Sequence, residues 1–268
     1  MAEADKPHRV KSDMWALSGT FLSAAPLRVA VVGVGGSGSE VVSNLVHVDL
    51  ALRVHGYGGL HVIAFDPDVV SEANVVRQRY TIADIGNSKA ETLISRVNLA
   101  CSLDWEAVPA AFKREAGRGT WDIVISCVDT RKARKQLHGY AFADRFGVWR
   151  FWLDLGNTAT SGQAILGTPR GKSRALAYAL PCATELHPEL MDTHVVDDEA
   201  PSCSALDAIA RQDLFVNKMV ALLGTNLLWR LLKDGKLSEH AVYFDLERYA
   251  ISPAAAPKKP KRRPAQDR

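Results

Sequence analysis

Two arginines, Arg77 and Arg79, lie in the stretch NVVRQRY, shortly after the acidic run FDPDVV. The preceding residues, LHVIAFD, predict a strand that ends at Asp66, so the arginines follow the point where the chain leaves the sheet. A dinucleotide cofactor needs no guanidinium pair there unless it carries a 2′-phosphate. A triphosphate that must lose pyrophosphate does need cations at its outer phosphates. The arginines and Lys89 downstream therefore indicate phosphate chemistry.

A glycine-rich turn, GVGGSG at 33–38, directly follows the first apolar run. Glycines here let the backbone turn tightly and approach a phosphate, which then lies at the positive end of the next helix. Asp66 ends the second strand, where a carboxylate accepts hydrogen bonds from ribose hydroxyls. Both features indicate an adenine nucleotide. Asp129, in SCVDT, ends a later strand at the same edge and is well placed to hold a magnesium ion.

The elements that must position these residues alternate between strand and helix, which is typical of a mostly parallel sheet with helices on both faces. The predicted strands are 27–34, 60–66, 105–110, 121–129 and 149–156, and the predicted helices are 36–48, 88–100 and 131–146. The run SGQAILGTP predicts the start of an antiparallel extension. A Pro-, His- and Asp-rich loop at 181–204, a helix at 205–233 and a strand at 241–246 complete the expected order.

We therefore expect an α/β Rossmann-like domain over 26–250, preceded by an N-terminal segment, 1–25, and followed by a basic tail, 251–268. The tail carries six Lys and Arg and one Asp, a net charge of +5. Because the whole chain has a net charge of only +3, the rest of it is slightly acidic. Such a Pro- and Lys-rich tail buries no core and is expected to be disordered. Contact of the tail with nucleic acid or an acidic partner is the alternative.

Composition excludes several other classes of protein. The 268 residues are 47% apolar and 24% charged, as in a globular chain. No apolar leader opens the sequence, and the four cysteines are scattered without a CxxC pair. We therefore expect a cytoplasmic protein with neither a disulfide framework nor bound zinc. Polar residues interrupt the most apolar stretch, 214–232, which favours a buried helix over a membrane span.

The motifs GVGGSG, DPDVVSEANVVRQ, GNSKAE and SCVDT together resemble the adenylation domain of the ThiF/MoeB/HesA and ubiquitin-activating-enzyme superfamily. The stretches WLDLGN…SGQAILG and PSCSALDAIARQDLFVNKMVA are most similar to ThiF-like proteins of the plasmid-associated PRTRC gene set. The resemblance implies an enzyme that uses ATP and Mg²⁺ to adenylate the C-terminal carboxylate of a small ubiquitin-like β-grasp protein. We also expect a homodimer.

The resemblance also implies a role for each matching position. The glycines at the phosphates would be Gly33, Gly35, Gly36 and Gly38, with Asp66 and Asp68 also in the nucleotide site. The residues around the triphosphate and the attacking carboxylate would be Asn74, Arg77, Gln78 and Lys89, with Asp129 on magnesium. Arg77 would stabilise the departing pyrophosphate, whereas Arg79 has no counterpart in the motif. We expect the side chains of Arg77 and Lys89 to be exposed.

Many members of the superfamily then transfer the acyl group to a cysteine. Cys203 follows the long loop and precedes a helix whose N-terminus would favour the thiolate, and Cys182 in the same loop is the alternative. An inert Cys203 also stays possible. The N-terminal segment lacks the family's YSRQ-like motif, so the source of a partner-supplied arginine is open. Two rival functions stay open as well: an NAD(P)-binding oxidoreductase, and a nucleotide-binding scaffold without catalysis.

Overall fold

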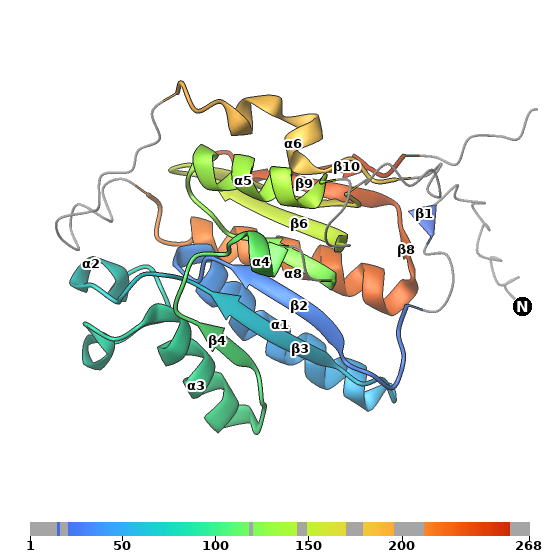
Figure 1. Cartoon of the computed structure of the whole chain (residues 1–268). Coiled ribbons are helices and arrows are strands. Elements are labelled where there is room, and N and C mark those ends of the chain that lie inside the picture. Colours follow the sequence, from blue (N-terminus) through green and yellow to red (C-terminus); the bar gives the residue numbers. More distant parts are fainter. Residues whose placement is uncertain are drawn as a thin grey trace, which may run out of the picture.

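The structure is a computed structural model that describes residues 21–117, 120–143, 149–169, 179–195 and 212–257 and the backbone of 15–16. They form a large sheet between two layers of helices, and a separate two-stranded sheet (Figure 1). The strands are β1 (Trp15–Ala16), β2 (Leu27–Val32), β3 (Leu60–Phe65), β4 (Glu106–Val108), β5 (Trp121–Ser126), β6 (Trp149–Asn157), β7 (Ser161–Gly167), β8 (Lys236–Leu237), β9 (Glu239–Asp245) and β10 (Ala250–Ala255). The helices are α1 (Gly36–Val54), α2 (Glu72–Val75), α3 (Lys89–Cys101), α4 (Arg114–Gly117), α5 (Arg131–Ala141), α6 (Ala183–Leu186) and α8 (Val216–Asp234), with 3₁₀ turns η1 (Ile82–Asp84) and η2 (Pro188–Met191).

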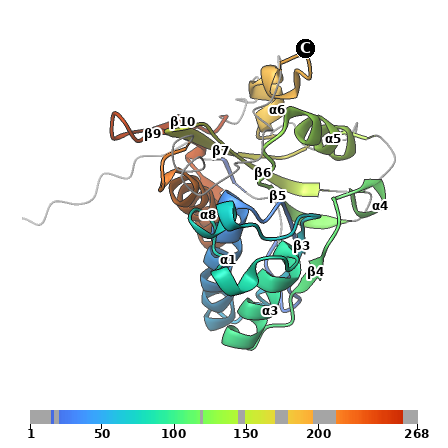
Figure 2. The same cartoon turned by 90° about the vertical axis from the view of Figure 1, so that its left-hand side faces the viewer.

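The large sheet has eight strands in the order β10-β9-β7-β6-β5-β2-β3-β4. The five strands from β4 to β6 are parallel, and β7, β9 and β10 extend the sheet with antiparallel pairing. This confirms the predicted α/β class and its antiparallel extension. From β2 the chain runs first to β3 on one side and later to β5 on the other. Ligands of such sheets bind beyond the carboxyl ends of the strands at this reversal, the edge that faces the viewer in Figure 2.

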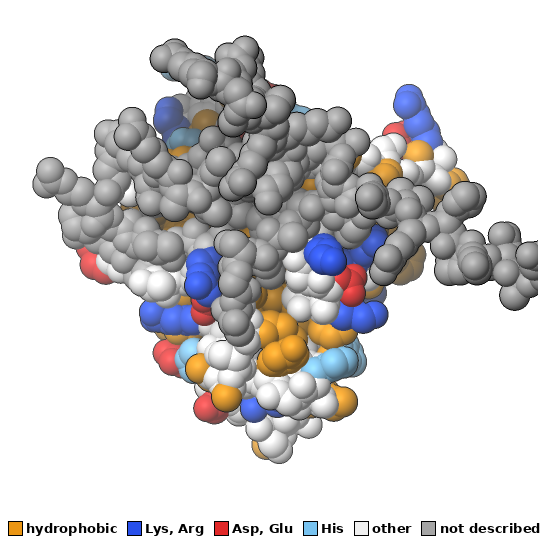
Figure 3. All heavy atoms as spheres, turned by 90° about the vertical axis from the view of Figure 1, so that its right-hand side faces the viewer, with side chains coloured by type: hydrophobic (Ala, Val, Ile, Leu, Met, Phe, Trp, Pro, Cys, Tyr) orange, Lys and Arg blue, Asp and Glu red, His pale blue; other side chains and the backbone are white. Residues whose placement is uncertain are grey.

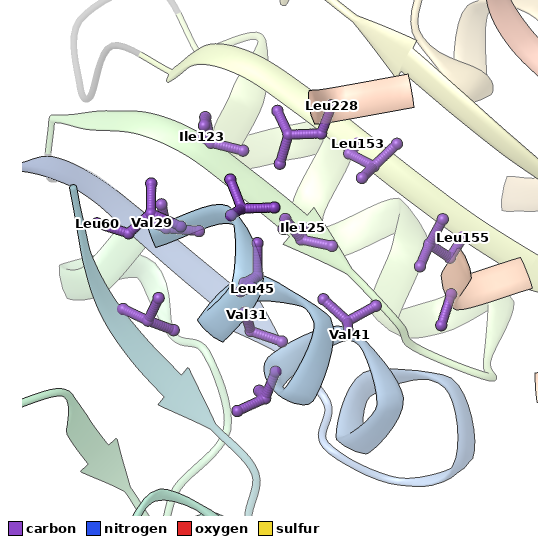
Figure 4. Close-up of a cluster of buried hydrophobic side chains, with 14 of the residues drawn as sticks. Val29, Val31, Val41, Leu45, Leu60, Ile123, Ile125, Leu153, Leu155 and Leu228 are labelled. Atoms are coloured by element: carbon purple, nitrogen blue, oxygen red, sulfur yellow. The ribbon is translucent and has the colours of Figure 1, made fainter. Parts of the chain in front are cut away.

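Both faces of the parallel strands are buried, because successive side chains of a strand point to opposite faces. On one face, Val29 and Val31 of β2 pack with Leu45 of α1 and Leu228 of α8 (Figure 4). The other face is aromatic, and its core includes Phe65, Phe112, Trp121, Trp149 and Trp152. Burial of each large apolar side chain contributes about 1.5–3 kcal/mol, so the centre of the sheet is a firm base for the loops at its carboxyl edge.

The opposite edge, where the parallel strands begin, carries paired charges among apolar side chains. The backbone N–H of Arg28 donates to Asp122 Oδ2 at 2.9 Å, and Arg150 Nη1 lies 3.4 Å from the other carboxylate oxygen. The guanidinium of Arg150 also lies over the ring of Phe21, 5.2 Å from its centroid. Figure 3 shows this side, where basic, acidic and apolar side chains alternate in the part that is described.

The expected loop at 181–204 and the expected helix at 205–233 both need correction. α6 and η2 lie within the loop, because Glu185 Oε2 accepts the N–H of Cys182 at 2.8 Å and closes the first turn of α6. Residues 205–211 of the expected helix lie outside the described residues; α8 begins at Val216, and before it Asp213 turns the chain by accepting the N–H of Phe215 at 2.8 Å. Within the described residues, no helix combines the length and hydropathy that a membrane span requires.

The strand β10, with Pro253 in its middle, crosses the expected boundary between domain and tail at residue 250. Asp245 Oδ1 accepts the N–H of Arg248 at 3.2 Å, and Tyr249 adopts a left-handed φ of +49°. This turn brings the chain back alongside β9, so the folded part extends to at least Ala255. Residues 258–268 of the expected tail lie outside the described residues.

An ion pair fixes the connection between β3 and α3. Arg96 Nη2 lies 2.8 and 2.7 Å from the carboxylate oxygens of Asp84, and Nη1 donates to the carbonyl of Arg79 at 2.8 Å. The backbone N–H and the hydroxyl of Thr81 donate to the same carboxylate. Burial alone would raise the pKa of Asp84, but the hydrogen bonds from Arg96 and Thr81 outweigh it and hold the pKa below its usual value.

Asp84→Asn should therefore destabilise the protein at neutral pH and much less in acid. With a folded-state pKa below the unfolded one, the carboxylate stabilises the fold above about pH 4, and this contribution is lost as pH falls through the lowered pKa. We expect a loss of about 1 kcal/mol at pH 7, since Arg96 is partly exposed. Urea unfolding of the variant and the wild type from pH 7 to pH 3 measures it. A deficit that stays constant over this range contradicts the assignment.

Candidate functional site

The turn between β2 and α1 requires glycine at Gly33 and Gly38. Gly33 has a φ of +85°, and a Cβ there would lie 2.9 Å from the carbonyl oxygen of Cys127. A Cβ on Gly38 would lie only 1.9 Å from the carbonyl oxygen of Gly33. The N-cap, Gly35, supplies no side-chain acceptor, and the first turn of α1 holds no acidic residue. The first N–H groups of α1 and its positive dipole end are therefore suited to an anion such as a phosphate.

Asp66 holds this turn from the neighbouring strand. Its Oδ2 accepts the N–H of Val34 at 2.7 Å, and its Oδ1 accepts the N–H of Asp68 at 2.9 Å. Burial raises the pKa of Asp66, and these two hydrogen bonds oppose the rise. The hydroxyl of Tyr80 lies 2.7 Å from the carbonyl oxygen of Val34, on the other side of the same residue. Each carboxylate oxygen has a further lone pair, so Asp66 can also accept from a ribose hydroxyl.

Lys89 is buried, and the expectation that it would be exposed was wrong. Its side chain is only 9% exposed, because Lys89 is the first residue of α3 and its Nζ reaches Asp68 Oδ2 at 2.9 Å. The backbone N–H of Lys89 also donates to the carbonyl of Asp68 at 3.0 Å. The carboxylate of Asp68 is largely exposed. The ion pair therefore holds an ammonium group beside Asp66, at the edge where the glycine turn lies.

The segment around Arg77 also reaches the start of α1. Arg77 is partly buried, not exposed as expected, and its Nη1 donates to Gln212 Oε1 at 2.5 Å. Gln78 Oε1 is buried close to Gly35 and accepts no hydrogen bond from the described residues. An acceptor held in this way beside the start of α1 fits a nucleotide that supplies a donor.

Two residues near Arg77 in the sequence, Asn74 and Arg79, stabilise the fold. Asn74 Oδ1 accepts the N–H of Ser71 at 2.9 Å and so caps α2. Arg79 Nη1 lies 3.1 Å from Glu40 Oε2 of α1, and the N–H of Arg79 donates to the hydroxyl of Ser39. Arg79 therefore attaches the segment to α1.

Asp129 lies on the next loop, beyond the end of β5. It is exposed, and α5 is capped by the adjacent Thr130, whose hydroxyl accepts the N–H of Ala133 at 3.2 Å. The described residues hold no group of three His, Cys, Asp or Glu side chains that would bind a metal by themselves. Magnesium commonly binds to one or two carboxylates and to the phosphates of a substrate, so Asp129 fits such an ion together with a nucleotide.

A buried ion pair under this loop was missed by the sequence analysis. Arg134 Nε lies 3.1 and 3.2 Å from the oxygens of Asp154, and its Nη2 donates to the carbonyl of Val128 at 3.0 Å. Ser126 donates to Asp154 and accepts from the indole N–H of Trp152. The pair thereby fixes the residue next to Asp129. An aspartate inside the apolar run WRFWLDLG was the available signal, since a buried carboxylate requires a partner.

The cysteines divide by burial. Cys182 is fully buried and is the N-cap residue of α6. Burial also raises the pKa of Cys127. Cys203 lies outside the described residues.

Comparison with known proteins identifies the family and the fold of the chain. The ThiF family model matches residues 21–260. The ubiquitin-like modifier-activating enzyme 5 of Culex quinquefasciatus is 28% identical over 231 residues, which are 80% of this chain and 53% of that protein. The chain thus spans about half the length of this curated relative.

Solved structures show the same fold. Escherichia coli MccB with ATP superposes with a TM-score of 0.57 at 16% identity, over 89% of this chain and 66% of that chain. PaaA gives 0.58 at 15% identity, over 86% and 64%. The narrower similarity to the PRTRC proteins stays a prediction. The family model matches most of the sequence, and the chain belongs to the ThiF family.

Proposed function

We propose that this protein is an ATP-dependent adenylyltransferase that activates the C-terminal carboxylate of a small ubiquitin-like protein. The observation that carries the proposal is the convergence of Arg77, Gln78 and Lys89 with Asp66 around the open N-terminus of α1. Two comparisons support the choice of reaction. One relative is named a ubiquitin-like modifier-activating enzyme, and MccB, which shares the fold, has been solved with ATP and with MccA.

In this reaction the protein must stabilise charge and position the reactants, and it does not need to transfer a proton. ATP supplies the α-phosphorus that the carboxylate attacks and the pyrophosphate that leaves. The attacking carboxylate is already ionised at neutral pH, so it needs no general base. The α1 N-terminus would hold phosphate oxygens, and Asp66 the ribose. Arg77 and Lys89 would offset the negative charge that grows on the leaving group, and Asp129 would hold Mg²⁺ against the phosphates.

Arg77→Ala and Lys89→Met should each lower ATP–pyrophosphate exchange by about 10²-fold or more, because each removes a cation that the transition state needs. Methionine keeps most of the buried volume of Lys89. The assay uses the full chain, ATP, labelled pyrophosphate and ubiquitin-like proteins encoded by neighbouring genes.

Arg79→Ala is the matched control, because this arginine contacts α1 and not the expected phosphate position; it should exchange at the wild-type rate. Near-normal exchange in both the Arg77 and the Lys89 variant would refute the proposal. Stabilisation of the wild type by NAD(P) and not by ATP would favour the oxidoreductase. Nucleotide binding without exchange would favour the scaffold.

Asp129→Asn should raise the magnesium concentration that gives half-maximal exchange, because an amide is a weaker ligand for the ion than a carboxylate. ATP binding measured without metal should change little. A variant that exchanges normally at limiting magnesium would remove Asp129 from the metal site.

Acyl transfer to Cys203 is a second proposed step, and the complete burial of Cys182 supports the choice between the two cysteines. The thiolate would attack the acyl-adenylate carbonyl, form a thioester and release AMP. Cys203→Ala should abolish a thiol-sensitive adduct with the partner on non-reducing gels and leave pyrophosphate exchange intact. An adduct that persists in this variant shows that Cys203 is not the acceptor.

The expected homodimer also stays a prediction.

A further inference from the structure

The side chain that holds Arg77 comes from QDLFVN, a stretch at the start of α8 to which the proposed reaction gives no role. Gln212 Oε1 accepts from Arg77 Nη1 at 2.5 Å and from Asn217 Nδ2 at 3.0 Å. On its other side, Gln212 Nε2 donates to the carbonyl of Thr158 at 3.3 Å. The amide group of Gln212 is thus held by three partners, and its oxygen faces the guanidinium.

Asn217 connects this amide to the glycine turn. It is 5% exposed, and its Oδ1 accepts from the hydroxyl of Ser37, in the first turn of α1, at 3.0 Å. Gly36 makes room for it, since a Cβ on Gly36 would lie 2.6 Å from the Asn217 side chain. Arg77 can only donate, so Oε1 of Gln212 faces it, and Asn217 must then turn its Nδ2 to that oxygen and its Oδ1 to the Ser37 hydroxyl. The same hydroxyl also lies 3.2 Å from Asn157 Oδ1. Arg77 is thus connected through two amides to the first turn of α1.

We propose that Gln212, oriented by Asn217, is a positioning residue that holds the guanidinium of Arg77 against the outer phosphates of a bound nucleoside triphosphate. The proposal rests on the proposed function, in which Arg77 meets those phosphates. An uncharged amide suits this task. It takes up one of the five N–H groups of Arg77 and adds no negative charge of its own, whereas a carboxylate in its place would pair with the arginine and compete with phosphate.

The test compares ATP with AMP, which lacks the outer phosphates. Titration calorimetry on the full chain gives both dissociation constants in the presence of magnesium. Gln212→Ala should weaken ATP binding about tenfold, as expected when a hydrogen bond to a charged group is lost, and leave AMP binding unchanged. Gln212→Glu, which keeps the size of the side chain, should weaken ATP binding more than alanine does. Arg79→Ala is the control and should bind both nucleotides as the wild type does.

Three outcomes overturn an assignment, and they differ. If Arg77→Ala loses the preference for ATP and Gln212→Ala keeps it, Gln212 does not position Arg77, and the proposed function stands. If Gln212→Ala and Gln212→Glu lower both affinities equally, Gln212 serves only the fold. If Arg77→Ala itself keeps the wild-type preference for ATP, the failure lies with the proposed function.

Discussion

The buried carboxylate of Asp66 is the interaction on which the geometry of the candidate site depends. It joins the turn after β2 to the segment after β3 through the N–H groups of Val34 and Asp68. Removing a carboxylate from water is costly, as its raised pKa reflects, and the two backbone hydrogen bonds offset part of that cost. Asp68 in turn pairs with Lys89. The glycine turn and the buried ammonium group of Lys89 are thus both connected to Asp66.

Two long helices, α1 and α8, begin side by side at the candidate site. α1 and α8 lie side by side and run in the same direction, with Ser37 near Asn217 at their starts and Asn44 bonded to Thr225 further along. Both positive ends therefore meet at the carboxyl edge, where they favour an anion. Gln212 lies shortly before α8, and the segment of Arg77 is attached to α1 through Arg79. The pairing of the two helices therefore brings Gln212 and Arg77 together although they are far apart in the sequence.

The parts of the site that could be predicted from the sequence were those encoded locally. The glycines of 33–38 follow an apolar strand directly, and Asp66 ends the next one, so spacing alone places them at one edge. Pairings across the chain could not be predicted in this way. Arg77 with Gln212, and Arg134 with Asp154, join separate elements that no periodicity connects.

The burial of Lys89 could not be predicted for the same reason, because its partner, Asp68, lies on another loop. β10 was missed for a different reason. Its sequence, AISPAA, is poor in strand-forming residues, and pairing with β9 determines its conformation.

The proline in β10 has a consequence for how molecules of this protein meet one another. β10 and β4 are the two outer strands of the large sheet, and an outer strand exposes backbone groups to which another chain can add. β4 is only three residues long, and Pro253 removes an N–H donor from the middle of β10. In the part of the chain that the structure describes, neither border of the sheet exposes a long, unbroken row of backbone hydrogen-bonding groups. The fold thus discourages open-ended stacking of sheets into aggregates, and favours association through side chains.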